Sequence, residues 1–302
     1  MSKKLISFGL VLAVFLAALS VFSFATENNS VYTVTVDGKA FQSNTSNSGN
    51  GWSYADGVLT LNKYNGSTVK STGDLNVIII NSANISGSSS GSYSASSCGI
   101  VATGALTLTV YGDVSIKGAD NGSAKGGEAV VADSVFIKSY DGTSVDLYGG
   151  RGAVALKAND ITLKVRDANI CGGSDASAIY FAKSLSFNGS SNADILAGSK
   201  NKSAITYNAK ADYYFSDDEQ TVEFEDKNSV VIVSAKNSFI YGDCNSDGKV
   251  NTKDIVLLAQ HLANYDVSIN EFAADCRYDD SVDIKDAVLL VQYLAMWNVY
   301  LG

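Results

Sequence analysis

Residues 243–254 read DCNSDGKVNTKD, and residues 275–286 read DCRYDDSVDIKD, at an offset of 32 residues. Oxygen-bearing side chains recur within both stretches at the spacing with which an EF-hand-type loop surrounds a calcium ion. Gly248, at the sixth position of the first stretch, has the backbone freedom that the sharp turn of such a loop needs. The leucine-rich sequence after each stretch repeats at the same offset. The tail is therefore predicted to form two calcium loops, each followed by a helix.

The candidate ligands stand at loop positions 1, 3, 5, 7, 9 and 12, of which position 7 offers its backbone carbonyl. The second loop departs from this pattern, because Arg277 stands at position 3 and Asp280 replaces the turn glycine and has to accept a left-handed backbone. We therefore expect two Ca²⁺ sites, the second weaker. The predicted ligands are Asp243, Asn245, Asp247, Lys249, Asn251 and Asp254 in the first loop and Asp275, Asp279, Ser281, Asp283 and Asp286 in the second.

From Tyr241 onward this tandem resembles a type I dockerin, the module that attaches bacterial plant-cell-wall proteins to cohesin domains of a scaffold protein (scaffoldin). The resemblance rests on the opening at Gly242, on Asp rather than Glu at the last loop position, and on a helix after each loop. It implies a cellulosome-type component that folds with calcium and binds a cohesin. The cohesin contacts that it implies are Thr252, Lys253, Ala259 and Gln260 in the first copy and Ile284, Lys285, Val291 and Gln292 in the second. A calcium-stapled tail without a partner is the alternative.

The body of the chain carries a looser repeat. Short segments of alternating apolar residues begin at Asp74, Ala105, Ser134, Asp160 and Ser184, spaced 24 to 31 residues apart. Three short strands per repeat indicate a mainly β fold, most simply a right-handed parallel β-helix, that is, a β-solenoid with three strands per coil. A β-sandwich is the alternative. We expect a signal peptide over residues 1–25, N-terminal cap strands over 26–57, the β-helix over 58–236 and the small α-helical dockerin over 237–302.

The N-terminus is typical of an export signal. Lys3 and Lys4 precede an apolar run from Leu5 to Phe24, and Ala25 offers a small residue at the cleavage site. A retained membrane anchor is the alternative, since the run is long enough to span a bilayer. We expect a secreted, extracellular protein, attached to the cell surface through a cohesin scaffold and free of the membrane after cleavage. The net charge of -9 argues against nucleic acid as a partner.

Four cysteines are present. Cys244 and Cys276 occupy the same position in the two loops and are candidates for a disulfide in an oxidising compartment, subject to a geometry that sequence does not give. Cys98 and Cys171 fall at different points of different repeats. We expect these two to be buried free thiols.

Alternation within the strands predicts a candidate ligand surface on the body. Where Leu106 and Leu108 point inward, their neighbours point outward and stack on the next repeat about 4.8 Å away. One exposed patch would then gather cations and aromatic rings, namely Tyr111, Phe136, Lys138, Tyr140, Lys164 and Arg166. Aromatic faces suit sugar rings, and cations pair with carboxylates, so the patch predicts an acidic, pectin-like plant cell-wall polysaccharide. A solvated face with stacked aromatics is the alternative.

The segment from Trp52 to Gly66 and the repeats after it resemble a group of secreted clostridial β-helix proteins that includes polygalacturonate binders. That resemblance implies carbohydrate binding. No catalytic residue is assigned, because the single histidine, His261, lies in the tail and the Asp217–Asp218 pair is expected in an exposed loop. A calcium-dependent polysaccharide lyase, using Lys138, Lys164 and Arg166, is the enzymatic alternative. A purely structural or adhesive solenoid is the third hypothesis.

Overall fold

The computed structural model describes residues 31–140, 142–188, 191–208, 220–225, 229–235, 239–279 and 281–301. The predicted signal peptide, Asp280 and the Asp217–Asp218 pair lie outside these residues. No helix within the described ranges combines the length and apolarity needed to cross a bilayer. Tyr32–Gly302 forms one compact unit.

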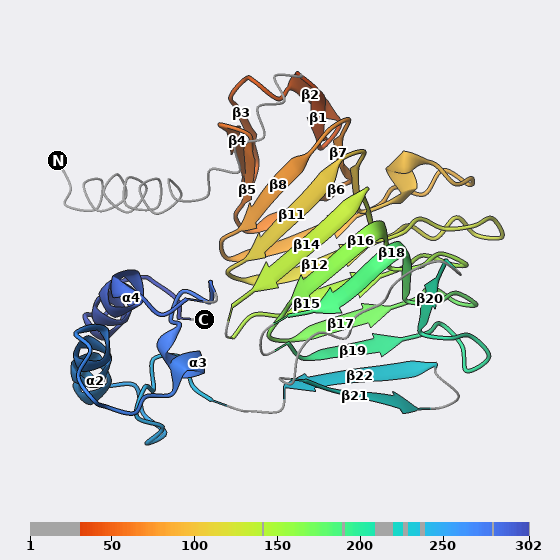
Figure 1. Cartoon of the computed structure of the whole chain (residues 1–302). Helices are drawn as coiled ribbons and strands as arrows, with labels where there is room; N and C mark the ends of the chain where they lie inside the picture. The colour runs from red at the N-terminus through yellow and green to blue at the C-terminus, as the bar shows by residue number, and fades with distance from the viewer. Residues whose placement is uncertain are drawn as a thin grey trace. The chain divides into compact units, whose positions relative to one another are not determined.

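Short strands make up the chain as far as Ala235, as the alternating apolar residues predict, so the expected mainly β class is confirmed. Most of these strands are labelled in Figure 1, and their bounds are β1 (Thr33–Val36), β2 (Lys39–Gln42), β3 (Asn47–Gly49), β4 (Trp52–Ala55), β5 (Val58–Leu61), β6 (Tyr64–Ser67), β7 (Val69–Ser71), β8 (Leu75–Ile79), β9 (Ser82–Ser86), β10 (Ile100–Ala102), β11 (Ala105–Val110), β12 (Asp113–Lys117), β13 (Val130–Val131), β14 (Ser134–Ser139), β15 (Val145–Tyr148), β16 (Leu156–Lys164), β17 (Ala168–Cys171), β18 (Ile179–Phe187), β19 (Ala193–Leu196), β20 (Ile205–Tyr207), β21 (Gln220–Glu225) and β22 (Val230–Ala235). A short 3₁₀ helix, η2, spans Ala95–Ser97. At the N-terminal end the pairing is antiparallel, between β1 and β2 and through β3, β4 and β5.

Parallel ladders run through the middle of the body. One ladder joins β5, β8, β11, β14, β16 and β18 in that order. A second joins β6, β9, β12, β15, β17 and β19. A third joins β7, β10, β13, β16, β18 and β20, so the long strands β16 and β18 belong to both the first and the third ladder.

The predicted register of the first ladder is confirmed. Thr109 pairs with Ile78 and with Lys138, and Lys138 pairs with Lys164, in the outward column expected from sequence. The inward residues Leu106 and Leu108 are buried in one continuous apolar core. Each fully buried Leu or Ile contributes roughly 1.5–3 kcal/mol, so a shift of one residue in register would lose this contribution along a whole strand.

The C-terminal end of the body differs from the predicted repeat. The predicted β-helix extends to residue 236, but β22 pairs antiparallel with β19 and with β21. Val231 and Val233 of β22 are buried in the core. The backbone of β22 therefore pairs with the edge of β19, the last strand of the second ladder, where the backbone groups would otherwise be unpaired.

The tail contains the helices α2 (Thr252–Leu262), α3 (Glu271–Ala274) and α4 (Ile284–Leu294). Asn251 and Asp283 cap α2 and α4, and both helices begin with a complete capping box. A cap of this kind is worth about 1 kcal/mol. Leu258 of α2 and Leu290 of α4, equivalent in the repeat, are both fully buried in a core separate from that of the body.

Candidate metal centres and the faces around them

The first acidic loop is closed by its own carboxylates. Asp243 accepts hydrogen bonds from the backbone N–H groups of Asp247 (3.0 Å) and Gly248 (2.8 Å). Asp254 accepts from the N–H groups of Asn245 (3.2 Å) and Asn251 (2.8 Å). Gly248 has a φ of +82°, the left-handed conformation predicted for the turn. The first and last candidate ligands of the loop thus both hold its backbone by hydrogen bonds.

The second loop repeats this closure. Asp275 accepts from the N–H of Asp279 (3.0 Å), and Asp286 accepts from those of Arg277 (2.9 Å) and Asp283 (2.8 Å). Oxygens of Asp275, Asp279 and Asp286 all lie within 4.8 Å of one another. This converging set of carboxylates fits a hard cation such as Ca²⁺.

Electrostatics at the second loop agree with a site for a positive charge. Burial, opposed by hydrogen bonds from the N–H groups of Asp283 and Arg277, raises the pKa of Asp286 to about 6, and the carboxylates of Asp275 and Asp279 add to the rise. Arg277, at ligand position 3, has its Nη1 2.7 Å from Oδ2 of Asp279, as an ion pair without the alignment of a hydrogen bond. The guanidinium therefore occupies part of the space that an oxygen ligand would use and brings a competing cation.

The two loop cysteines are free thiols, and both are fully buried in the core of the tail. Burial, with the Asp254 and Asp243 charges, raises the pKa of Cys244 to about 12. Burial also raises the pKa of Cys276, and the proximity of Cys244 adds to it. Of the two body cysteines, Cys98 is buried as expected, whereas the prediction was wrong for Cys171, which faces outward on β17 and is half-buried.

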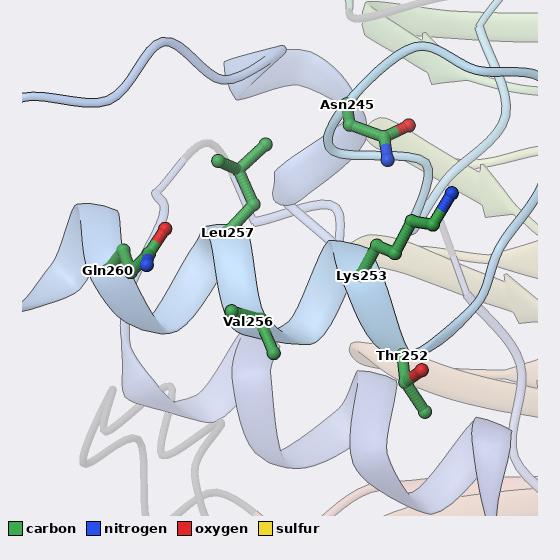
Figure 2. A pocket seen from close by; sticks show the side chains of 6 residues that line it. All are labelled: Asn245, Thr252, Lys253, Val256, Leu257 and Gln260. Atoms are coloured by element: carbon green, nitrogen blue, oxygen red, sulfur yellow. The ribbon is translucent and has the colours of Figure 1, made fainter.

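The helix faces predicted from the dockerin resemblance are open. Thr252, Lys253 and Gln260 line a hollow of about 350 Å³ on α2, together with Asn245, Val256 and Leu257 (Figure 2). Ala259 and Lys285 are exposed, and Gln292 is half-buried. Ile284 and Val291 of α4 are 67% and 51% exposed.

Sequence reasoning missed several apolar residues on these faces. Val256 of α2 and its repeat equivalent Val288 of α4 are 56% and 51% exposed, and Met296 and Trp297 follow α4 at 92% and 56%. The signal available was the helical spacing, since Val256 lies four residues after Thr252 and Val288 four after Ile284. Exposed apolar side chains in a row on one face are typical of a surface that binds another protein.

The basic patch expected on the body is not exposed. Lys138 and Lys164 are only 8% and 4% exposed. Nζ of Lys138 donates to the backbone carbonyls of Arg277 (3.0 Å) and Tyr278 (2.8 Å) in the second loop. The prediction of an open cationic surface at these two residues was therefore wrong, because the tail packs on the strands that carry them.

The remaining members of the patch are close together, as predicted. The rings of Tyr111 and Tyr140 are stacked with centroids 4.5 Å apart, and Phe136 pairs with Thr107 and Thr162 on the neighbouring strands. Arg166 is half-buried, with its Cζ 4.4 Å from the centroid of Tyr241. The aromatic column is thus formed, but its basic neighbours contact rings of the tail.

Comparison with known proteins assigns the tail. Residues 241–295 match the family model described as Dockerin type I domain. No curated protein and no solved structure matches the chain. The tail is thus similar to type I dockerin domains over these residues, and domains of that type bind calcium.

Proposed function

We propose that this protein is a secreted component of a cellulosome-type assembly that attaches to a scaffoldin cohesin through its calcium-loaded dockerin. The observation that carries the proposal is the pair of closed acidic loops, each leading into a capped helix with an exposed apolar face. Calcium would be held by the carboxylate and amide side chains of the two loops, where it would fix the helices in position. Two sites are proposed, the second weaker because of Arg277.

The proposal is tested by titrating the full chain with a panel of type I cohesin domains in a calorimeter. We expect saturable one-to-one binding in calcium and none after chelation. Replacing Thr252 and Lys253 by alanine tests the α2 face, and replacing Ile284 and Lys285 by alanine tests the α4 face. Tyr265→Ala, at an exposed position beyond α2, is the control. Calcium-independent binding, or no binding to any cohesin, would contradict the proposal.

For the body, the right-handed β-helix with three strands per coil is the architecture that we propose. Its support is the parallel pairing of three sets of strands that recur in the same order along the chain. Crossover connections between parallel strands of one sheet are right-handed in about 98% of cases. Residues 26–57 would cap its N-terminal end.

A second proposal is that the body binds plant cell-wall polysaccharide, acidic and pectin-like, on the second ladder rather than at the covered patch. There the outward residues combine an aromatic ring, a cation and hydrogen-bonding groups. Nζ of Lys117 lies 5.1 Å from the ring centroid of Tyr148, and Asn169 donates to Asp146 (2.9 Å) on the neighbouring strand. Rings and paired polar groups of this kind are suited to sugar hydroxyls and carboxylates.

Affinity electrophoresis of the full chain through polygalacturonate gels, with a neutral glucan gel as control, tests the second proposal. We expect retardation by polygalacturonate that Lys117→Ala and Tyr148→Ala abolish and Lys157→Ala, on the third ladder, leaves unchanged. Unaltered mobility in both gels would leave the structural solenoid as the better hypothesis. Release of unsaturated product in calcium would identify the lyase instead.

A further inference from the structure

The second calcium loop of the dockerin contacts the body of the same chain through the Tyr278 side chain and through two backbone carbonyls that accept hydrogen bonds from Lys138. The ring of Tyr278 has three cations around it: Nζ of Lys164 at 3.7 Å from its centroid, Nζ of Lys138 at 5.0 Å and Cζ of Arg166 at 5.5 Å. The Tyr278 hydroxyl donates to the carbonyl of Asn188 (3.2 Å) at the end of β18. Tyr278 itself is 4% exposed. We name this set of contacts the tyrosine clamp.

The clamp and the predicted calcium ligands form hydrogen bonds to the same stretch of backbone. Lys138 holds the carbonyls of Arg277 and Tyr278, while the N–H of Arg277 is held by Asp286. Tyr278 has a φ of +54°, a left-handed conformation that costs an ordinary residue roughly 1–2 kcal/mol and therefore needs support from its surroundings. The clamp and a bound ion would both stabilise this one loop conformation.

The charges near the loop allow the clamp to act without a bound ion. Three carboxylates that converge within 4.8 Å repel one another when no cation lies among them. Arg277 supplies one positive charge 2.7 Å from Asp279, and Lys138 brings another to the loop carbonyls. Ser246, the equivalent of Tyr278 in the first loop, also has a positive φ (+57°). Being a serine, it has no ring for lysines to cover.

We infer that the body surface formed by Lys138, Lys164, Arg166 and Asn188 is an intramolecular docking site for the second dockerin loop, and that this site keeps the loop ordered when calcium is withdrawn. Because the clamp and the ion favour the same conformation, each increases the affinity of the other for the loop. The first loop, whose turn lacks the ring, depends on calcium alone. The dockerin is thereby held on the body, with its open α2 and α4 faces left for a partner.

Hydrogen exchange of the full chain, with and without chelator, tests this inference. After chelation we expect the amides of residues 275–279 to exchange more slowly than those of 243–247, by on the order of tenfold. The double variant Lys138→Met, Lys164→Met should remove that difference, since methionine preserves the packing and loses the charge. Lys157→Met is the matched control, because Lys157 lies on the same strand, β16, over an outward ring (6.0 Å from Tyr180) that belongs to the body.

A conservative variant separates the clamp from loop folding in general. Tyr278→Phe keeps the ring and its three cations and loses the hydroxyl that donates to Asn188, so it should retain most of the difference between the loops. Equal exchange of the two loops in the unmodified protein would overturn the inference. So would a difference that persists in the double variant. Neither outcome bears on cohesin binding in calcium, which is measured separately.

Discussion

Nζ of Lys164 lies 3.7 Å from the ring centroid of Tyr278, 114 residues later in the chain, in a contact that leaves the lysine 4% exposed and the tyrosine 4% exposed. A cation over an aromatic face is worth about 0.5–1 kcal/mol when exposed and about 2 kcal/mol when desolvated. Here both partners are removed from water, so the larger value applies. This pair belongs to the body on one side and to a calcium loop on the other.

A double-mutant cycle measures that contact. Lys164→Met and Tyr278→Leu should each destabilise the calcium-loaded protein, and their coupling free energy should be about 1–2 kcal/mol in urea unfolding. The left-handed backbone of Tyr278 costs the same in both arms of the cycle and cancels. The cycle Lys157→Met with Tyr180→Leu, across a distance of 6.0 Å, should give a smaller coupling. Additive effects of Lys164 and Tyr278 would show that the ring and the cation do not interact.

For this contact the sequence predicted the positions of the lysines but not the residue that covers them. The column of Thr109, Lys138 and Lys164 followed from a period of two within strands and a repeat between them, and the observed register agrees. The same reasoning left the column exposed, because local alternation separates inside from outside but contains no information on what packs on the outside. The residue that covers it, Tyr278, lies in a loop whose own pattern indicated only calcium ligands.

In the dockerin, by contrast, the local features of the candidate site were predictable. The left-handed turn at Gly248 and a helix after each loop are local properties, and the structure has both. The ligand assignments themselves stay predictions. The sequence showed that a cation, Arg277, stands at a ligand position, but it did not predict that Arg277 pairs with Asp279. Pairing of β22 with β19 was missed because an apolar alternating strand reads alike in parallel and antiparallel ladders.

Thiol reactivity reports calcium loading of the dockerin. Cys244 and Cys276 are fully buried, and burial raises the pKa of both thiols, so we expect neither to react with iodoacetamide in calcium at neutral pH. Chelation should expose Cys244 first, since its loop lacks the tyrosine clamp. Peptide mapping by mass spectrometry measures the rates. Half-buried Cys171 provides an internal control whose rate should not depend on calcium. Alkylation of Cys244 that is equally fast with and without calcium would contradict the link between ion binding and folding.

Acid should destabilise the body through Glu128. This carboxylate is 1% exposed; burial opposes its ionisation, but the hydrogen bond from Lys125 (2.8 Å) and one from Tyr93 outweigh it and lower its pKa. A lowered pKa in the folded state contributes stability that is present above the unfolded value of about 4.3 and is lost as the pH falls through the folded value. Glu128→Gln should therefore lower the Tm at pH 7 and flatten its decrease below about pH 4. Thermal unfolding followed by circular dichroism measures the Tm of both proteins at each pH. If the Tm of the variant falls below pH 4 as steeply as that of the unmodified protein, Glu128 does not cause the acid destabilisation.

Close stacking at one corner of the body should make Gly173 intolerant of any side chain. A Cβ at Gly173 would collide with the backbone carbonyl of Gly150, and a Cβ at Gly198 would collide with that of Gly173 in the same way. Both carbonyls accept hydrogen bonds that a displacement would break, from the N–H groups of Ala153 (2.9 Å) and Ala176 (2.9 Å) respectively. We therefore expect Gly173→Ala to destabilise the protein by more than about 3 kcal/mol, the upper range for ordinary substitutions.

Gly142→Ala separates this effect from the conformational freedom of glycine. Gly142 has a φ of +75° and no heavy atom near its absent Cβ, so alanine there should cost only about 1–2 kcal/mol. Urea unfolding of both variants in calcium compares the two costs. Because the collision at Gly173 is with backbone while the strain at Gly142 is purely local, the first variant should also lose protection from hydrogen exchange in the neighbouring strands β15 and β17. If Gly173→Ala and Gly142→Ala destabilise the protein equally, the strands at this corner can move apart to admit a methyl group. The prediction of a backbone collision at Gly173 would then be wrong.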